Sequence, residues 1–162
     1  MSLVFACIAP HGGLAIEELC KPEDREVAAV TRRGMEELGR RFDAAKPEVT
    51  VVLTPHNIHV EGAMAVITAG SLFGELKEGG AGRGAFDPNA GTRSVSLRAT
   101  TDRELATSCL EALRGGGIPA VGVHYGANDA AAAVMPMDWA ILVPLWSRSG
   151  PWAAGGRYLL PW

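Results

Sequence analysis

The chain has 162 residues, a formal net charge of −3, and a composition that is 48% hydrophobic and 20% charged. A chain of this length is expected to form one globular domain over residues 1–162, with a core large enough to fold without disulfides or a structural metal. The near-neutral charge excludes a protein that binds nucleic acid mainly through phosphate contacts, and no apolar run is long enough for a membrane span. Neither nucleic acid nor membrane is an expected partner.

The first apolar segment, residues 3–9, is short and rich in β-forming side chains, which predicts a buried strand. No basic residues precede it, so we interpret it as part of the fold and not as a signal peptide. The three cysteines, Cys7, Cys20 and Cys109, are widely spaced and indicate neither a disulfide framework nor a zinc ribbon. We expect a cytoplasmic protein in which Cys7 and Cys109 are buried core thiols.

Helical and β-type patterns alternate along the rest of the chain. Apolar side chains recur at helical spacing over residues 23–45, a stretch that Pro22 precedes and Pro47 ends. Short runs of β-forming residues predict four further strands, over residues 49–53, 63–68, 94–99 and 118–123. This alternation indicates an α/β fold with a mostly parallel or mixed central sheet and flanking helices.

A second helix and two irregular stretches complete the expected organisation. The helix is expected to begin at Thr101 or Asp102, either of which can cap it, and to end at the glycines 115–117. The glycine-rich stretch 74–93 predicts a flexible surface excursion, and it lacks the lysine and hydroxyl residue of a phosphate-binding loop. From residue 146 onward no clear period is present, so we interpret this part as an atypical tail.

All four histidines come at or just after predicted core strands. His11 follows the first strand, His56 the second, and His124 the strand 118–123. Ligands of open α/β sheets bind outside the carboxyl ends of the strands, so we expect these imidazoles to converge on one cleft. Neutral imidazoles are common metal ligands and suit Fe(II) or Zn(II). We therefore predict that His11 and His56, each held by a preceding proline, bind a metal ion.

The other two histidines and one aspartate have several interpretations. His59 is a further metal ligand in the same loop as His56, or an exposed residue before the next strand. His124 is a third ligand, a catalytic base or a turn residue. Asp138 precedes the apolar segment 139–146, where a helix cap is the expected role. The sequence has no GxSxG nucleophile elbow, so a Ser-His-Asp hydrolase is not supported.

Three segments of the sequence resemble the class III extradiol ring-cleavage dioxygenases, in particular the branch formed by their B-type subunits. They are IAPHGGLAIEEL (8–19), VVLTPHNIHVEGAMAV (51–66) and MDWAILVPLW (137–146), within a similarity that covers residues 3–146. The resemblance implies an Fe(II) ion held by two histidines and one glutamate, in which His11 and His56 match the two histidines. It also implies that a small aromatic diol and O2 bind side by side and that the ring opens next to the hydroxyls.

The chain also departs from this family. The family's glutamate ligand and a catalytic histidine lie in a C-terminal half that has no counterpart here, and Trp139 stands where several members have a histidine. His59 and His124 match no family ligand. Two alternatives follow: a catalytically incomplete metal-binding or assembly module of the same fold, and a zinc-dependent hydrolase on the same two histidines. An incomplete sheet would favour a homo-oligomer.

Overall fold

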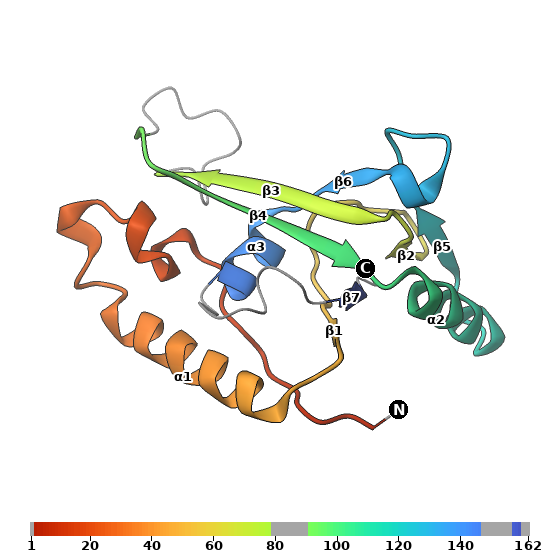
Figure 1. The fold of residues 1–162 in the computed structure, drawn as a ribbon, viewed down its shortest axis with the longest axis horizontal. Coiled ribbons are helices and arrows are strands. Elements are labelled where there is room, and N and C mark those ends of the chain that lie inside the picture. Colours follow the sequence, from red (N-terminus) through yellow and green to blue (C-terminus); the bar gives the residue numbers. More distant parts are fainter. Residues whose placement is uncertain (1, 79–90, 147–156, 160–162) are drawn as a thin grey trace. The chain divides into compact units, whose positions relative to one another are not determined.

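The computed structural model describes residues 2–78, 91–146 and 157–159 (Figure 1). In this part of the chain the α-helices are α1 (Ala29–Ala45), α2 (Arg103–Gly115) and α3 (Trp139–Trp146). The strands are β1 (Val49–Val51), β2 (Met64–Ile67), β3 (Ser71–Lys77), β4 (Ser94–Thr101), β5 (Ala120–Val123), β6 (Val134–Pro136) and β7 (Arg157–Leu159). Short 3-10 turns are η1 (Gly13–Ala15), η2 (Glu17–Leu19), η3 (Pro22–Asp24) and η4 (Ala130–Ala132).

The strands form two sheets. The larger has the order β1-β7-β4-β3-β6, and the smaller pairs β2 with β5. The β1–β7, β4–β7, β3–β6 and β2–β5 pairs are parallel, whereas β3 and β4 run in opposite directions (Figure 1). Mixed sheets together with helices confirm the expected α/β class.

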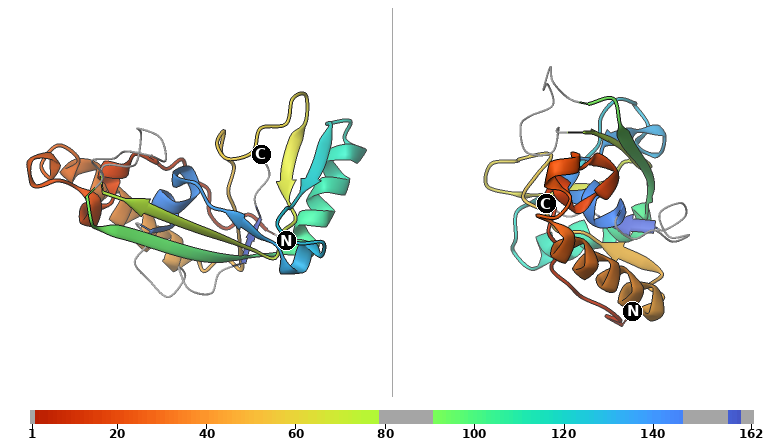
Figure 2. Two further views of the ribbon diagram at one scale, coloured as in Figure 1. Left: turned by 90° about the horizontal axis from the view of Figure 1, so that it is seen from above. Right: turned by 90° about the vertical axis from the view of Figure 1, so that its left-hand side faces the viewer.

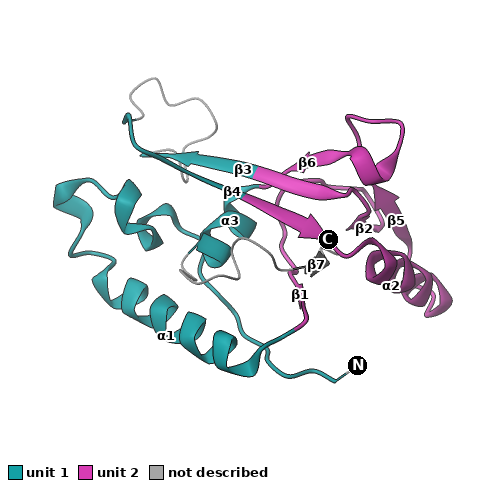
Figure 3. Ribbon diagram, viewed as in Figure 1, with its two compact units in different colours: residues 1–47, 74–97, 138–153 teal, residues 48–73, 98–137, 154–162 magenta. Residues whose placement is uncertain are grey.

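The chain divides into two compact units, each assembled from three separate stretches. Unit 1 comprises Met1–Pro47, Gly74–Leu97 and Asp138–Ala153, and unit 2 comprises Glu48–Phe73, Arg98–Met137 and Ala154–Trp162. The backbone passes from one unit to the other within β3 and again within β4 (Figure 3). Each unit is described by itself below.

In unit 2, helix α2 packs on the small parallel sheet of β2 and β5 (Figure 2). Val66 of β2 and Ala106 of α2 are fully buried at the centre of this contact. The apolar face of α2 packs around them with Leu105, Cys109, Leu110 and Leu113. The predicted helical spacing is confirmed, and the strand expected over 118–123 is formed from Ala120 onward. Cys109, expected to be a buried core thiol, is only partly buried.

In unit 1, helix α1 buries Met35 and Phe42, which lie two turns apart on one face. The ring of Phe5 meets that of Phe42 edge to face, with centroids 5.6 Å apart. The helix ends at Ala45, where Lys46 adopts a left-handed conformation (φ 47°) before Pro47. The predicted end of this helix is therefore confirmed.

The predicted start of this helix at residue 23 is wrong by one and a half turns. Pro22 begins the 3-10 turn η3, and regular α-helix starts only at Ala29. The apolar positions Val27 and Val30, on which the longer helix depended, are 74% and 73% exposed. Periodicity alone overestimated the helix because Val27, which precedes α1, is not part of the core face, and Val30 within α1 is exposed as well.

The predicted first strand is also not formed. Residues 2–10 have no strand assignment, and Leu3 and Ile8 are 85% and 99% exposed. Cys7, expected in the core, is exposed as well. Apolar character indicates that a segment gains from burial, but a strand also requires a neighbour with free backbone groups, which composition does not reveal.

The stretch 74–93 is more ordered at its beginning than expected. Strand β3 extends to Lys77 with alternating burial, and residues 79–90 lie outside the described part of the chain. The buried positions of β3 include Gly74, so the glycine hid the period-two pattern that Leu72 and Leu76 complete. Most of the predicted tail after residue 146 also lies outside the described residues; of it only β7 is described.

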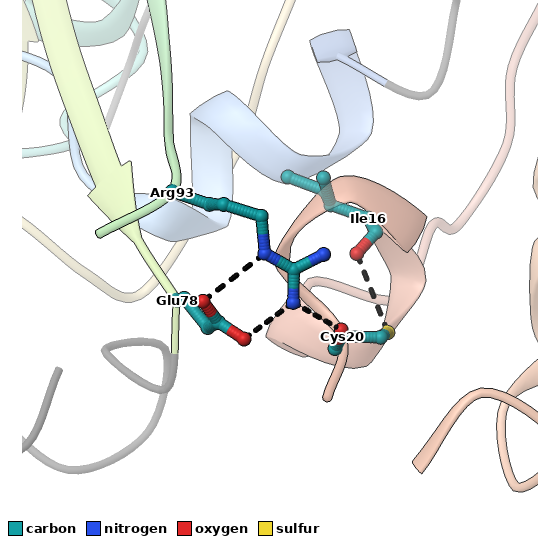
Figure 4. A network of polar contacts seen from close by, with 4 residues as sticks. All are labelled: Ile16, Cys20, Glu78 and Arg93. Carbon is teal, nitrogen blue, oxygen red and sulfur yellow. Dashed lines mark hydrogen bonds and ion pairs between the residues drawn. The ribbon is translucent and has the colours of Figure 1, made fainter. Parts of the chain in front are cut away.

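A polar network around Cys20 joins two stretches of unit 1, residues 1–47 and 74–97 (Figure 4). Arg93 forms an ion pair with Glu78 and donates a further hydrogen bond to the backbone oxygen of Cys20 at 2.8 Å. The hydrogen bond from Arg93 lowers the pKa of the Glu78 carboxyl, and the same contact raises the pKa of the Arg93 guanidinium. Burial raises the pKa of the Cys20 thiol, against the opposing charge of Arg32. Cys20 is therefore an unreactive core thiol.

Candidate active site

The loop after β1 carries His56 and His59 and is held by its own polar contacts. The backbone N–H of His56 donates to Thr54 Oγ1 at 3.2 Å. Asn57 adopts a left-handed conformation (φ 83°) and donates from Nδ2 to the backbone oxygen of Pro136 at 3.0 Å. The loop is thus anchored on both sides of His56, whose side chain is half-buried.

A half-open cavity of about 190 Å³ lies between this loop and the start of β2. Its walls are mostly apolar, with one imidazole and one hydroxyl: Thr54, Pro55, Ile58, His59, Val60, Ala63 and Ala65. His59 is exposed, as one of its two interpretations expected, and it lines this cavity. The cavity thus offers mostly apolar walls and two polar side chains to a small ligand.

His124 lies directly after β5, as predicted, at the carboxyl end of the small parallel sheet. The register pairs Ile67 with Val123, so the next residues, Thr68 and His124, come side by side. The hydroxyl oxygen of Thr68 lies 3.3 Å from Nδ1 of the exposed His124 ring. Thr68 was not singled out from the sequence, because its pairing with His124 depends on strand register across 56 residues.

His11 belongs to unit 1 and is half-buried just before η1. The premise that it follows a strand is wrong, because residues 2–10 form none. His56, His59 and His124 belong to unit 2. Within the ranges 2–78, 91–146 and 157–159, no three His, Cys, Asp or Glu side chains form a group able to hold a metal ion. The metal-ligand roles of His11, His56 and His59 therefore stay predictions.

The donors themselves suit the metal that the sequence predicts. His11 and His56 are half-buried, so each imidazole is reachable yet partly shielded from water. A two-histidine, one-carboxylate site takes two imidazoles among its three protein ligands, and such donors favour Fe(II) and also accept Zn(II). The chemistry of these donors thus fits either ion.

Asp138 has the capping role expected of it. Its Oδ1 accepts a hydrogen bond from the backbone N–H of Ala140 at 2.7 Å, and its backbone oxygen accepts from Leu142 at 2.9 Å. These bonds begin helix α3, whose residues 140–143 and 145 are buried. The most apolar motif of the sequence is thus a core helix of unit 1.

The fold and the histidine-bearing loops define an α/β protein with imidazoles placed after β1 and β5. The family described as the catalytic LigB subunit of aromatic ring-opening dioxygenase matches residues 5–147. The chain therefore belongs to this family of ring-opening dioxygenases, which are metal-dependent enzymes. The resemblance seen in the two Pro-His segments and the segment 137–146 is confirmed. No curated protein was found to match the chain.

No helix among the described residues combines the length and the apolar character needed to cross a membrane.

Proposed function

We propose that this chain acts in extradiol cleavage of small catechol-type rings by O2. The observation that carries the proposal is the family match over residues 5–147, which includes both Pro-His segments. We propose the cytoplasm as its location.

His11 and His56 are the proposed metal ligands, with His59 as a further candidate and Fe(II) as the preferred ion over Zn(II). The bound metal would hold the diol and O2 next to each other. The chain's own contribution is to hold His56 in place. Thr54 accepts a hydrogen bond from the backbone N–H of His56, and the next residue, Asn57, donates to the backbone oxygen of Pro136.

The cavity beside His59 is the proposed site for the aromatic ring. Its volume of about 190 Å³ exceeds the roughly 150 Å³ of an apolar cavity that binds benzene. Apolar walls from Ile58, Val60 and Ala63 suit the faces and edges of one ring, whereas Thr54 and His59 offer polar contacts to hydroxyls. A single-ring diol is therefore the preferred substrate, and a fused two-ring diol is expected to fit poorly.

His124 is the proposed catalytic residue, as an acceptor of a proton from a substrate hydroxyl. Its exposed imidazole follows β5, and histidine is the side chain that enzymes use most often for general acid–base catalysis. Removing a hydroxyl proton makes the diol more electron-rich, which favours its reaction with O2.

Metal content and O2 uptake together test the proposal. Anaerobically purified protein is loaded with Fe(II), and O2 consumption is followed with catechol and with 2,3-dihydroxynaphthalene. We expect near-stoichiometric iron and uptake with catechol, both lost in His11→Ala and His56→Ala but kept in Glu36→Gln, a change on the exposed side of α1. Metal binding without uptake would favour the assembly module, whereas zinc with ester hydrolysis would favour the hydrolase.

A size change in the cavity tests the ring site separately. Ala63→Leu places a larger side chain among the cavity walls. We expect the KM for catechol to rise about tenfold, equivalent to about 1.4 kcal/mol, with iron content unchanged. An unchanged KM would place the ring elsewhere.

A further inference from the structure

We infer that Thr68 is a positioning residue for His124, fixing the ring proton on Nδ1 so that Nε2 is the nitrogen that accepts a proton. The inference rests on the proposed function for the role of His124 in turnover. The tautomer itself can be tested without any turnover.

The position of Thr68 follows from the parallel ladder. The backbone N–H of Thr68 donates to the backbone oxygen of Val123 at 2.9 Å, which continues the β2–β5 pairing by one residue. The neighbouring side chains of Thr68 and His124 therefore meet at the carboxyl edge of both strands. The 3.3 Å separation of Oγ1 and Nδ1 is a long but direct hydrogen bond.

A hydrogen bond and the space beside Gly122 bear on the position of Thr68. Arg103, the first residue of α2, donates from Nε to the backbone oxygen of Thr68 at 3.1 Å. A Cβ atom at Gly122 would lie only 3.1 Å from the Thr68 methyl group and 3.3 Å from the side chain of Leu110. The methyl group thus occupies room that the glycine leaves, and the β-branched threonine has few χ1 rotamers to choose from.

The hydroxyl suits both protonation states of an acid–base histidine. It accepts a hydrogen bond from Nδ1–H when the ring is neutral and also when the ring is an imidazolium. In the proposed step a substrate O–H bond breaks, its electron pair stays on the oxygen, and the proton goes to Nε2. The Nδ1–H···Oγ1 hydrogen bond is unchanged throughout, so the ring does not need to turn.

The experiment measures the tautomer of His124 by ¹⁵N NMR of the intact protein, at an alkaline pH where the ¹⁵N shifts of the ring no longer change with pH. We expect the Nδ1–H form in the wild type and in Thr68→Ser. Thr68→Val has the same shape without the hydroxyl, and we expect it to shift His124 toward the Nε2–H form. His59, which is exposed and lies outside this contact, provides the unchanged reference signal.

Turnover gives a second, separate readout. In a chain that consumes O2 with catechol, Thr68→Val is expected to lower kcat about tenfold with little change in KM, and Thr68→Ser to restore it. Wild-type His124 in the Nε2–H form would overturn the inference whether or not any variant folds. An unchanged kcat in an active Thr68→Val enzyme would overturn it too. Absence of O2 uptake with the Nδ1–H form present would instead refute the proposed function and leave the positioning intact.

Discussion

Glu78 shows how one ionised side chain ties separate stretches of chain together. Its carboxyl pairs with Arg93, which also reaches the backbone oxygen of Cys20. Because the hydrogen bond from Arg93 depresses the pKa of Glu78 in the folded state, folding favours the ionised form. The stabilisation is complete above the ordinary value of 4.5 and is lost as the pH falls through the lower folded value.

We predict that Glu78→Gln lowers Tm by a few degrees at neutral pH and that the difference from wild type shrinks below about pH 4. Thermal unfolding over a pH series measures this. Glu75→Gln is the matched control, because it removes the same charge from an exposed position on β3. A Glu78→Gln deficit that does not depend on pH would contradict the role assigned to the ion pair.

Replacing either of two glycines by alanine is expected to change the free energy of unfolding in opposite directions. A Cβ at Gly70 would lie 1.9 Å from the backbone oxygen of Ala131, whereas Gly34, inside α1, has no atom within 4 Å of such a Cβ. We predict that Gly70→Ala lowers the free energy of unfolding by about 3 kcal/mol. Gly34→Ala is expected to raise it by about 0.5–1 kcal/mol, because alanine restricts the unfolded chain and favours helix. Urea denaturation of both variants measures the difference, and equal effects would refute the close approach at Gly70.

Among the elements, α2 has the clearest local signal for where it begins. The sequence left Thr101 and Asp102 as alternative caps, and the structure resolves this in favour of Asp102. Its Oδ1 accepts from the backbone N–H of Leu105 at 3.0 Å, while Thr101 is buried at the end of β4. The helix then ends at the predicted glycines.

We predict that Asp102→Ala lowers the free energy of unfolding by about 1 kcal/mol, since a helix N–H loses its acceptor. Asp102→Asn keeps a side-chain oxygen and is expected to retain most of the stability. Chemical denaturation monitored by circular dichroism compares the two. Equal losses in both variants would mean that charge, and not capping, is the main contribution of Asp102.

Elements with local signals were predictable, and elements that depend on distant partners were not. The cap of α2, the strands 64–67 and 120–123 and the cap of α3 follow from neighbouring residues. Residues 3–9 were wrongly predicted as a strand, because their apolar character does not show whether a neighbouring strand is available to pair with them. In the candidate site, the sequence placed His56 and His124 after strands correctly, but the Thr68 contact required knowledge of register.

At the scale of the whole molecule, the exposed apolar side chains near the N-terminus bear on association. Leu3 and Ile8 are almost fully exposed. Exposed apolar side chains that lie close together can form a contact region for a partner. Homo-oligomerisation, expected from the sequence, stays our prediction, and we expect the contact between copies to include Leu3 and Ile8.

We predict that the wild type associates increasingly over a concentration series in analytical ultracentrifugation. The double variant Leu3→Ser/Ile8→Ser is expected to associate at least tenfold more weakly, because it removes apolar surface available to a partner. Ile118→Ser, a partly exposed apolar residue before β5, is the control. A wild type that stays monomeric, or a double variant that associates as the wild type does, would contradict this location.

Because each compact unit is made of separate stretches of chain, it cannot complete its folding early in translation. Helix α3 packs on η1 in unit 1, and β7 pairs with β1 in unit 2, so each unit joins early residues to late ones. A ribosome releases η1 and β1 long before it has made their partners, although many proteins fold N-terminal regions first during translation. Both units consequently finish folding only after most of the chain has left the exit tunnel.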